Sequence, residues 1–211
     1  ELYLQALTIR QQVVEHHPHI TRYKDELVLN HESLTAFYSS INRPSSAEEH
    51  LREAVKLRLQ LGGAVSAVPQ PRIALARVYS VLAETCARAG RYAEAEAECR
   101  KGSELIEPLA RDRPNDRSAA LVLAENLGVL GHLQIQNHKP QEGIATMTRA
   151  ITLFEELLRK APDDNSVRML LREAYGIRAS ALKSRGELLK TVGDLLRIKS
   201  LEQPPRPSSG K

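Results

Sequence analysis

The sequence predicts an all-α protein built from antiparallel helix pairs that repeat along the chain. Three observations support this prediction. Helix-forming residues dominate the 211 residues, whereas only 4% are aromatic and tryptophan is absent. Shifting the chain against itself by 48 residues, the distance from Pro114 to Pro162, aligns apolar residues with apolar ones. Glycine, asparagine and proline also recur at matching places in successive repeats, where helices must end.

The 48-residue repeat identifies the buried positions of the predicted helices. Residues related by this shift are small at one position and apolar at two others, as buried repeat positions require. Between them, apolar residues recur every three or four residues and so fall on one face of a helix. Each repeat therefore contains two helices. The aligned sets are Ala6, Ala54, Gly102 and Ala150; Ile9, Leu57, Leu105 and Leu153; and Val13, Leu61, Leu109 and Leu157.

Prolines mark most of the junctions between repeats. Pro18, Pro114 and Pro162 follow the first, fifth and seventh helices, because the residue before a proline disfavours helix. The second junction, near residue 66, is the exception. Gly-Gly before it and Pro-Gln-Pro after it predict a longer and looser connection.

A second kind of turn separates the two helices of each pair. Gly90 and Gly186 occupy equivalent places and suit the left-handed residue that ends a helix, as does Asn42; His138 aligns with them. Aspartates and asparagines after the prolines cap the helices that follow. The expected helices cover residues 1–16, 20–41, 46–62, 72–89, 92–112, 116–137, 141–160, 165–185 and 187–200.

The charge pattern argues against nucleic-acid binding. The formal net charge is +4, and basic residues alternate with acidic ones instead of forming a block. Aromatic residues that stack on bases are scarce. We therefore expect a solvated helical surface and no nucleic-acid partner.

No apolar window has the length and composition of a membrane span. The nearest one, residues 118–137, contains Glu125, Asn126, Gln134 and Gln136 and is interpreted as a buried helix. The first residues lack the charged start and apolar run of a signal peptide. The chain is expected to be soluble and, by default, cytoplasmic.

Metal and redox chemistry have little support in the sequence. Cys86 and Cys99 are too few for a disulfide framework or a four-cysteine zinc site and are expected to pack as small buried residues. Three histidines, His16, His17 and His19, are close in sequence, but Pro18 interrupts the helix between them. We expect an exposed turn there, with metal binding as the alternative, and no cofactor.

The stretch GRYAEAEAE, residues 90–98, resembles a tetratricopeptide repeat, in which a turn glycine, an aromatic residue and Glu-Ala precede a small residue and a leucine. The resemblance runs from Tyr3 to about Leu189. It implies a right-handed superhelical solenoid of about nine helices that binds proteins. The period of 48 exceeds the usual value of about 34, so both helices of each pair should be longer than in ordinary repeats.

Longer stretches, such as ALTIRQQVVEHHP and LFEELLRKAPDDNSVRMLLREAYG, resemble the long repeats that follow the kinase domain in planctomycete-type bacterial serine/threonine protein kinases. Asn30 and Asn126 occupy the asparagine position of that pattern, while Val78 and Ala174 depart from it. The resemblance implies an accessory interaction region or scaffold. The chain contains no glycine-rich phosphate loop, catalytic loop or metal-binding DFG segment, so no enzyme activity is expected of it.

In tetratricopeptide proteins the first helix of each pair lines a concave groove that holds a partner peptide. Carried onto this sequence, the groove has mixed charge and lacks the stacked basic residues that clamp a terminal carboxylate. Arg77, Arg88 and His132 are its best hydrogen-bond donors. The expected partner-binding residues are Glu32, Arg77, Glu84, Arg88, Glu125, His132 and Gln136.

Other functions remain open at the level of sequence. The first and last helices should expose apolar faces that a second copy of the chain could cover, which makes a homo-oligomer the main alternative. RNA contact and ligand sensing between repeats are weaker ones. Residues 1–200 are expected to form one repeat domain, followed by a flexible Pro/Ser-rich tail at 201–211.

Overall fold

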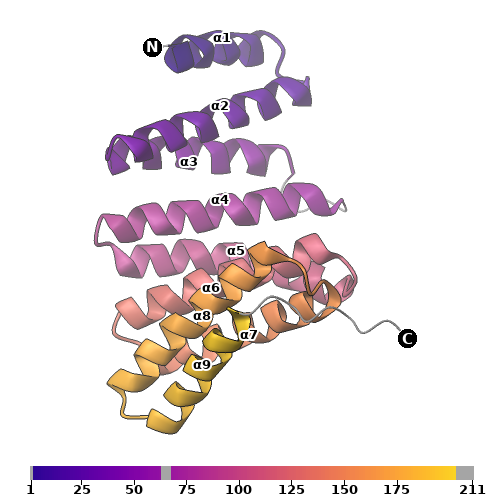
Figure 1. Cartoon of the computed structure of the whole chain (residues 1–211). Coiled ribbons are helices and arrows are strands. Elements are labelled where there is room, and N and C mark those ends of the chain that lie inside the picture. The colour runs from indigo at the N-terminus through magenta and orange to yellow at the C-terminus, as the bar shows by residue number, and fades with distance from the viewer. Residues whose placement is uncertain (1, 63–67, 203–211) are drawn as a thin grey trace. The chain divides into compact units, whose positions relative to one another are not determined.

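The computed structural model describes residues 2–62 and 68–202, and all regular structure within these ranges is helical (Figure 1). The predicted all-α class and helix order are confirmed. The helices are α1 Leu2–His16, α2 Thr21–Ser40, α3 Pro44–Gln60, α4 Pro69–Arg88, α5 Tyr92–Asp112, α6 Arg117–Gln136, α7 Pro140–Lys160, α8 Asn165–Ser184 and α9 Leu188–Leu201.

The helices form two compact units, Glu1–Asp112 and Arg113–Lys211. In the first unit α2 pairs with α3 and α4 with α5, while α1 packs on α2 and α3 on α4. Figure 1 shows these consecutive helices side by side, from indigo to magenta. In the second unit α6 pairs with α7 and α8 with α9, and α8 also contacts both α6 and α7.

The turn inside each pair is the same left-handed helix ending. Asn42, Gly90, His138 and Gly186 have φ values of 55°, 77°, 59° and 74°, so the prediction for this position is confirmed. In each turn the following N–H donates to a carbonyl five residues earlier, at 2.8 to 3.0 Å. This hydrogen bond closes a Schellman motif, which satisfies carbonyls that the end of the helix leaves without partners.

The starts of α3, α4, α6, α7 and α8 follow two local rules. Asp116 accepts hydrogen bonds from the backbone N–H groups of Ser118 and Ala119, and Asp164 accepts one from Val167. These caps confirm the predicted role of the aspartates after the junction prolines. Other helices begin with a proline, which fits there because the first N–H of a helix has no intrahelical acceptor.

The predicted start of α4 was wrong by one turn. Pro-Gln-Pro is predicted to lie in a loose connection, whereas α4 begins at Pro69 and buries it. Proline is tolerated in the first helical turn, so this segment begins the helix instead of delaying it. The rest of the connection, including the junction near residue 66, lies outside the described residues, as does the end of the predicted tail.

Small residues let α6 and α7 approach closely. A Cβ atom added to Gly131 would lie 2.9 Å from the backbone N of Met147, and one added to Gly143 would lie 2.6 Å from the carbonyl O of Gly131. This contact belongs to α6, and the expectation that no window has the length and composition of a membrane span is wrong, because α6 alone among the described helices has both. More than half of its apolar window, 56%, is buried inside the protein, as in the core helix of a helical unit.

Candidate interaction surface

An exposed stripe on α4 carries three of the predicted partner-binding residues. Arg77, Glu84 and Arg88 are exposed, and with exposed Val81 they follow the four-, three- and four-residue spacing of one helix face. Arg88 lies near α2, since its Nη2 donates to Ser39 Oγ at 3.5 Å. We call Arg77, Val81, Glu84 and Arg88 the α4 face.

Glu32 lies on α2, and its carboxylate pairs with Arg58 of α3. Its Oε1 accepts hydrogen bonds from Arg58 Nη2 at 2.6 Å and Nε at 3.3 Å. The Arg58 side chain is 17% exposed and that of Glu32 is 33% exposed, so the pair is only partly shielded from solvent. A ligand that bound Glu32 would have to compete with this guanidinium, a contact the sequence analysis did not anticipate.

The remaining predicted residues lie together on α6 of the second unit. Glu125 is half-buried, whereas His132 and Gln136 are exposed one helical turn apart. Gln136 Nε2 lies 3.1 Å from His132 Nε2, within reach of an amide-to-ring hydrogen bond. Within the second unit these residues form a small polar patch.

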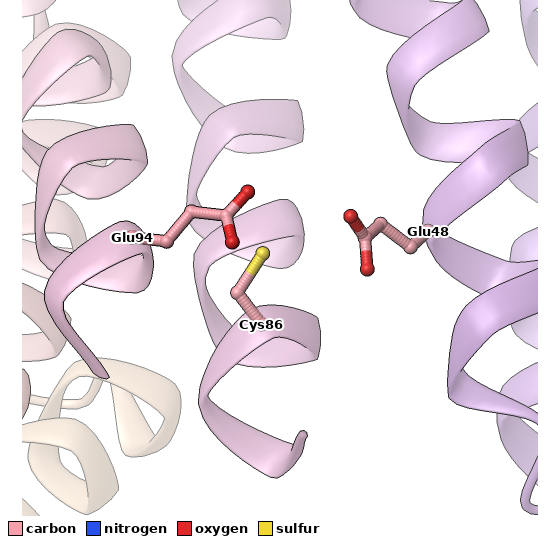
Figure 2. A group of neighbouring side chains, drawn as sticks. All are labelled: Glu48, Cys86 and Glu94. Carbon is pink, nitrogen blue, oxygen red and sulfur yellow. The ribbon is translucent and has the colours of Figure 1, made fainter. Parts of the chain in front are cut away.

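A cluster missed by the sequence analysis joins α3, α4 and α5. Figure 2 shows Glu48, Cys86 and Glu94 converging from three helices, and their carboxylate oxygens and thiol sulfur lie within 4.8 Å of one another. Residues so far apart in sequence share no local spacing, and no motif could have revealed them. Two carboxylates and a thiol are potential metal ligands, so their protonation and partners decide what they do.

Two arginines already occupy the carboxylates of this cluster. Arg52 contacts Glu48 at 2.8 Å and Glu94 at 2.5 Å. Arg91 pairs with Glu48 and with Glu94, the latter at 2.6 Å. Burial raises the pKa of Glu48, but hydrogen bonds from Arg91 and Arg52 outweigh it and leave the pKa below its usual value. The Glu48 carboxylate is therefore ionised, and both guanidinium groups lie against it and against Glu94.

The thiol of this cluster favours its protonated form. Burial, followed by the charge of Glu48, raises the pKa of Cys86. A metal ion would have to deprotonate this thiol and displace both arginines. The donor set therefore fits an ion-pair network that ties α3 to α4 and α5 better than it fits a metal centre. Both cysteines are buried, as predicted, and burial raises the pKa of Cys99 to about 12.

The three histidines near Pro18 are exposed, and His16 and His17 contact different groups. His16 Nδ1 lies 2.7 Å from the carbonyl O of Gln12, and the ring of His17 lies 5.9 Å from that of Tyr23. This placement agrees with the predicted exposed turn.

A different histidine pair lies between α2 and α3. The Nδ1 atoms of His31 and His50 are 3.1 Å apart, and the ring of Tyr38 stacks on His50. Such a contact needs one donor and one acceptor, so two protonated rings would repel each other. Burial, then the charge of His50, lowers the pKa of His31 against the opposing effect of Glu53 and Glu49. Burial also lowers the pKa of His50, against Glu49.

This pair should make the stability of the first unit fall in mild acid. An unfolded histidine titrates near pH 6.5, above the lowered pKa values of the folded state, so the unfolded chain binds more protons as the pH falls below about 6.5. The free energy of unfolding is therefore expected to be highest above that pH and to decrease through the folded pKa values. Urea midpoints at about pH 7.5 and pH 5 measure the difference.

Two variants distinguish the pH dependence due to His31 and His50 from that of other titrating groups. His50→Gln keeps a hydrogen-bonding side chain but removes one titrating ring, and should reduce the difference between the two urea midpoints. His19→Gln, at an exposed turn, should leave it unchanged. An equal pH dependence in wild type and His50→Gln would contradict this account.

No family model matches the sequence, and no curated protein matches it. Solved structures do resemble it. A putative kinesin light chain from Podosopora anserina with nearly identical TPR-like repeats has a TM-score of 0.60 at 13% identity, covering 95% of this chain and 87% of that one. BtubC (BKLC) from P. vanneervenii has a TM-score of 0.53 at 15% identity, covering 99% and 94%. MamA has a TM-score of 0.54 at 16% identity, covering 95% and 88%.

Sequence identities this low show a shared fold and nothing more. The matched structures include tetratricopeptide-like repeats and cover nearly all of the chain, in line with the helix pairs and left-handed turns described above. The chain therefore has an all-α fold of antiparallel helix pairs of the tetratricopeptide-like kind.

Proposed function

We propose that the chain is a protein–protein interaction scaffold that binds an acidic segment of a partner along the α4 face. One observation carries the proposal. Arg77 and Arg88 have no carboxylate within ion-pair distance among the described residues, although arginines of the same unit such as Arg52 and Arg91 do. An arginine without a carboxylate partner still offers a planar set of donors that matches a carboxylate.

The spacing of the two arginines describes the segment that would fit. They are eleven residues apart on one helix, which corresponds to about 16 Å along its axis. An extended chain covers that distance in about five residues. We therefore propose a segment with two acidic side chains about five residues apart, held by a preformed surface that loses little entropy on binding.

Within the second unit, the α6 patch is a separate polar surface for partner contact. His132 and Gln136 are exposed, and each can donate a hydrogen bond to a partner's backbone or accept one from it. Glu32 has a smaller part in this proposal, because Arg58 already holds its carboxylate.

The resemblance of the residue pattern to kinase-associated repeats supports a wider setting for this function. We propose that the array is an accessory region of a larger bacterial signalling protein of the serine/threonine kinase kind and works in the cytoplasm. No catalytic role is proposed for the chain itself, nor any nucleic-acid partner.

Quantitative affinity capture tests the α4 face. The chain would be immobilised and partners captured from lysate at about 50 mM and 300 mM salt, with wild type compared to Arg77→Ser/Arg88→Ser. Each lost charge-assisted hydrogen bond contributes about 1.5–3 kcal/mol, so capture of the specific partner should fall at least about tenfold. The control Arg159→Ser/Lys183→Ser removes two exposed charges elsewhere and should capture like wild type. Equal loss in both double variants would mean that net charge, not the α4 face, drives binding.

A further inference from the structure

Two histidines of the first unit bring ring nitrogens together between neighbouring helices. His31 on α2 is 4% exposed, whereas His50 on α3 is only half-buried. Their Nδ1 atoms are 3.1 Å apart, their ring centroids are 5.2 Å apart and their planes are inclined by 50°. A hydrogen bond between two neutral rings accounts for this contact, and so does one metal ion held by both rings. We call His31 and His50 the histidine pair.

The distance within the histidine pair is close to that of two ligands on one ion. In a tetrahedral zinc site each nitrogen lies about 2.0–2.1 Å from the metal, which places two such nitrogens about 3.3 Å apart. The observed separation is shorter by only about 0.2 Å, so a small shift would let both rings ligate one ion. Burial lowers the pKa of both rings and so favours the neutral form, which is the form that binds metals.

The surrounding helices hold the two rings in place. Thr35 Oγ1 donates a hydrogen bond to the carbonyl O of Ala47 at 3.4 Å, and these residues lie one helical turn from His31 and His50. The ring of Tyr38 stacks on that of His50, with 5.4 Å between centroids and 21° between planes. Stacking covers a face of the imidazole and leaves the edge that carries its nitrogens free. An ion would therefore find its ligands at nearly the right spacing, which reduces the cost of binding.

The charges around the histidine pair favour a cation. The carboxylates of Glu53 and Glu49 act on His31, and that of Glu49 also acts on His50. Glu53 follows His50 by three residues and so lies on the same face of α3. Its carboxylate is 46% exposed and contacts Lys56 at 3.3 Å. Such exposed ion pairs are weak, so a metal ion would compete with Lys56 for this carboxylate.

The other group of potential ligands in this unit, Glu48, Cys86 and Glu94, differs in its counter-charges. Two arginines already contact its carboxylates, and its thiol favours the protonated form. The histidine pair instead has neutral rings and neighbouring carboxylates, one of them paired only with an exposed lysine. A cation would add a favourable charge at the histidine pair, whereas at the other group it would have to displace two guanidinium groups.

We propose that His31 and His50 bind a divalent transition-metal ion of the zinc class, with Glu53 as the third ligand and water completing the coordination. Imidazole nitrogens suit Zn²⁺, Ni²⁺ and Cu²⁺, whereas Mg²⁺ and Ca²⁺ prefer sites made of oxygen atoms. The bound ion would link α2 to α3 and stabilise the first unit. The site shares no residue with the α4 face, so either proposal can fail without the other.

Titration of the whole chain with zinc chloride tests the inference. The protein would be treated with EDTA, dialysed and titrated by calorimetry at about pH 7.5, where imidazole is neutral. One ion per chain should bind. His50→Gln and His31→Gln should each weaken binding at least about tenfold, because the loss of even an outer contact to a metal ligand costs about 10–100-fold. Glu53→Gln should weaken it about tenfold for the same reason.

Two control variants address the other potential ligands. His17→Gln/His19→Gln removes exposed histidines at the turn after α1, and Cys86→Ser removes the thiol of the other group. Both should bind zinc like wild type. Cobalt(II) provides a second readout, since the bound ion should lack the thiolate-to-cobalt absorption band that cysteine ligation would produce. Circular dichroism should show that each variant keeps its helix content, and His50→Gln, at a half-buried position, keeps the test valid if His31→Gln does not fold.

Stability measurements complete the test. Zinc should raise the urea midpoint of wild type but not that of His50→Gln, because an ion that binds only the folded state stabilises it. Absence of zinc binding, equal binding by wild type and His50→Gln, or equal binding of Mg²⁺ and Zn²⁺ would overturn the inference. Loss of binding in His17→Gln/His19→Gln would also overturn it and assign the ion to the exposed turn. Unchanged binding by Glu53→Gln would overturn the assignment of the third ligand.

Discussion

Replacing Gly131 with alanine is expected to lower the free energy of unfolding of the second unit by about 2–3 kcal/mol. The added Cβ would lie 2.9 Å from the backbone N of Met147, 3.0 Å from the carbonyl O of Gly143 and 3.3 Å from the Cα of Met147. All three are backbone atoms and cannot rotate away as a side chain could. Relief requires α6 and α7 to move apart, which weakens the packing around buried Met147.

The neighbouring Gly128 provides a matched control on the same helix. A Cβ at this position meets nothing within 4 Å. Gly128→Ala should therefore stabilise the unit by about 0.5–1 kcal/mol, since alanine loses less backbone entropy in a helix than glycine. Urea denaturation at constant m-value measures both changes. If the two variants shift the urea midpoint in the same direction, the close approach of α6 and α7 does not limit stability.

Replacing Arg178 with methionine is expected to cost about 3–5 kcal/mol. Asp194 is 5% exposed, and Arg178 binds both of its carboxylate oxygens, at 2.9 and 2.7 Å. Removing the guanidinium leaves a buried carboxylate without its counter-charge. It also removes the hydrogen bond to Thr148 and the contact with the Tyr175 ring, so α7, α8 and α9 all lose a shared partner.

Two further variants separate the ion pair from other effects. Arg172 lies on the same helix as Arg178 and forms an exposed ion pair with Glu202, which follows α9. Arg172→Met breaks this pair and should lower the free energy of unfolding by less than about 1 kcal/mol. Arg178→Met/Asp194→Leu removes both charges and should recover much of the stability lost in Arg178→Met, because no unpaired charge remains. Thermal or urea unfolding of the four proteins gives the comparison. A double variant no more stable than Arg178→Met would show that packing, not charge, dominates at this site.

The helices were predictable because their signals are local. Asn42, Gly90 and Gly186 satisfy hydrogen bonds within their own turns, and Asp116 caps the helix that begins beside it. Such contacts depend on residues a few positions apart, which the repeat displays several times. The error at Pro69 arose from the same source, since proline ends one helix and begins another with equal ease.

The candidate surfaces were less predictable because their chemistry depends on distant residues. The pairing of Glu32 with Arg58 spans 26 positions, and that of Arg91 with Glu48 spans 43. Helical periodicity places Glu32 on a face but does not tell whether a neighbouring helix neutralises it. The sequence did indicate that the terminal helices would expose apolar residues. Which side chains of α9 stay exposed depends on how α9 packs on α8.

Packing between consecutive helices also bears on how the chain folds. Within each unit almost every helix contacts only the helices before and after it in sequence. Native contacts therefore join residues that are close along the chain, and closing the intervening loops costs little entropy. Each helix pair can collapse as soon as its own turn forms, without waiting for distant segments. A chain emerging slowly from a ribosome could thus complete its first unit before the second has been synthesised.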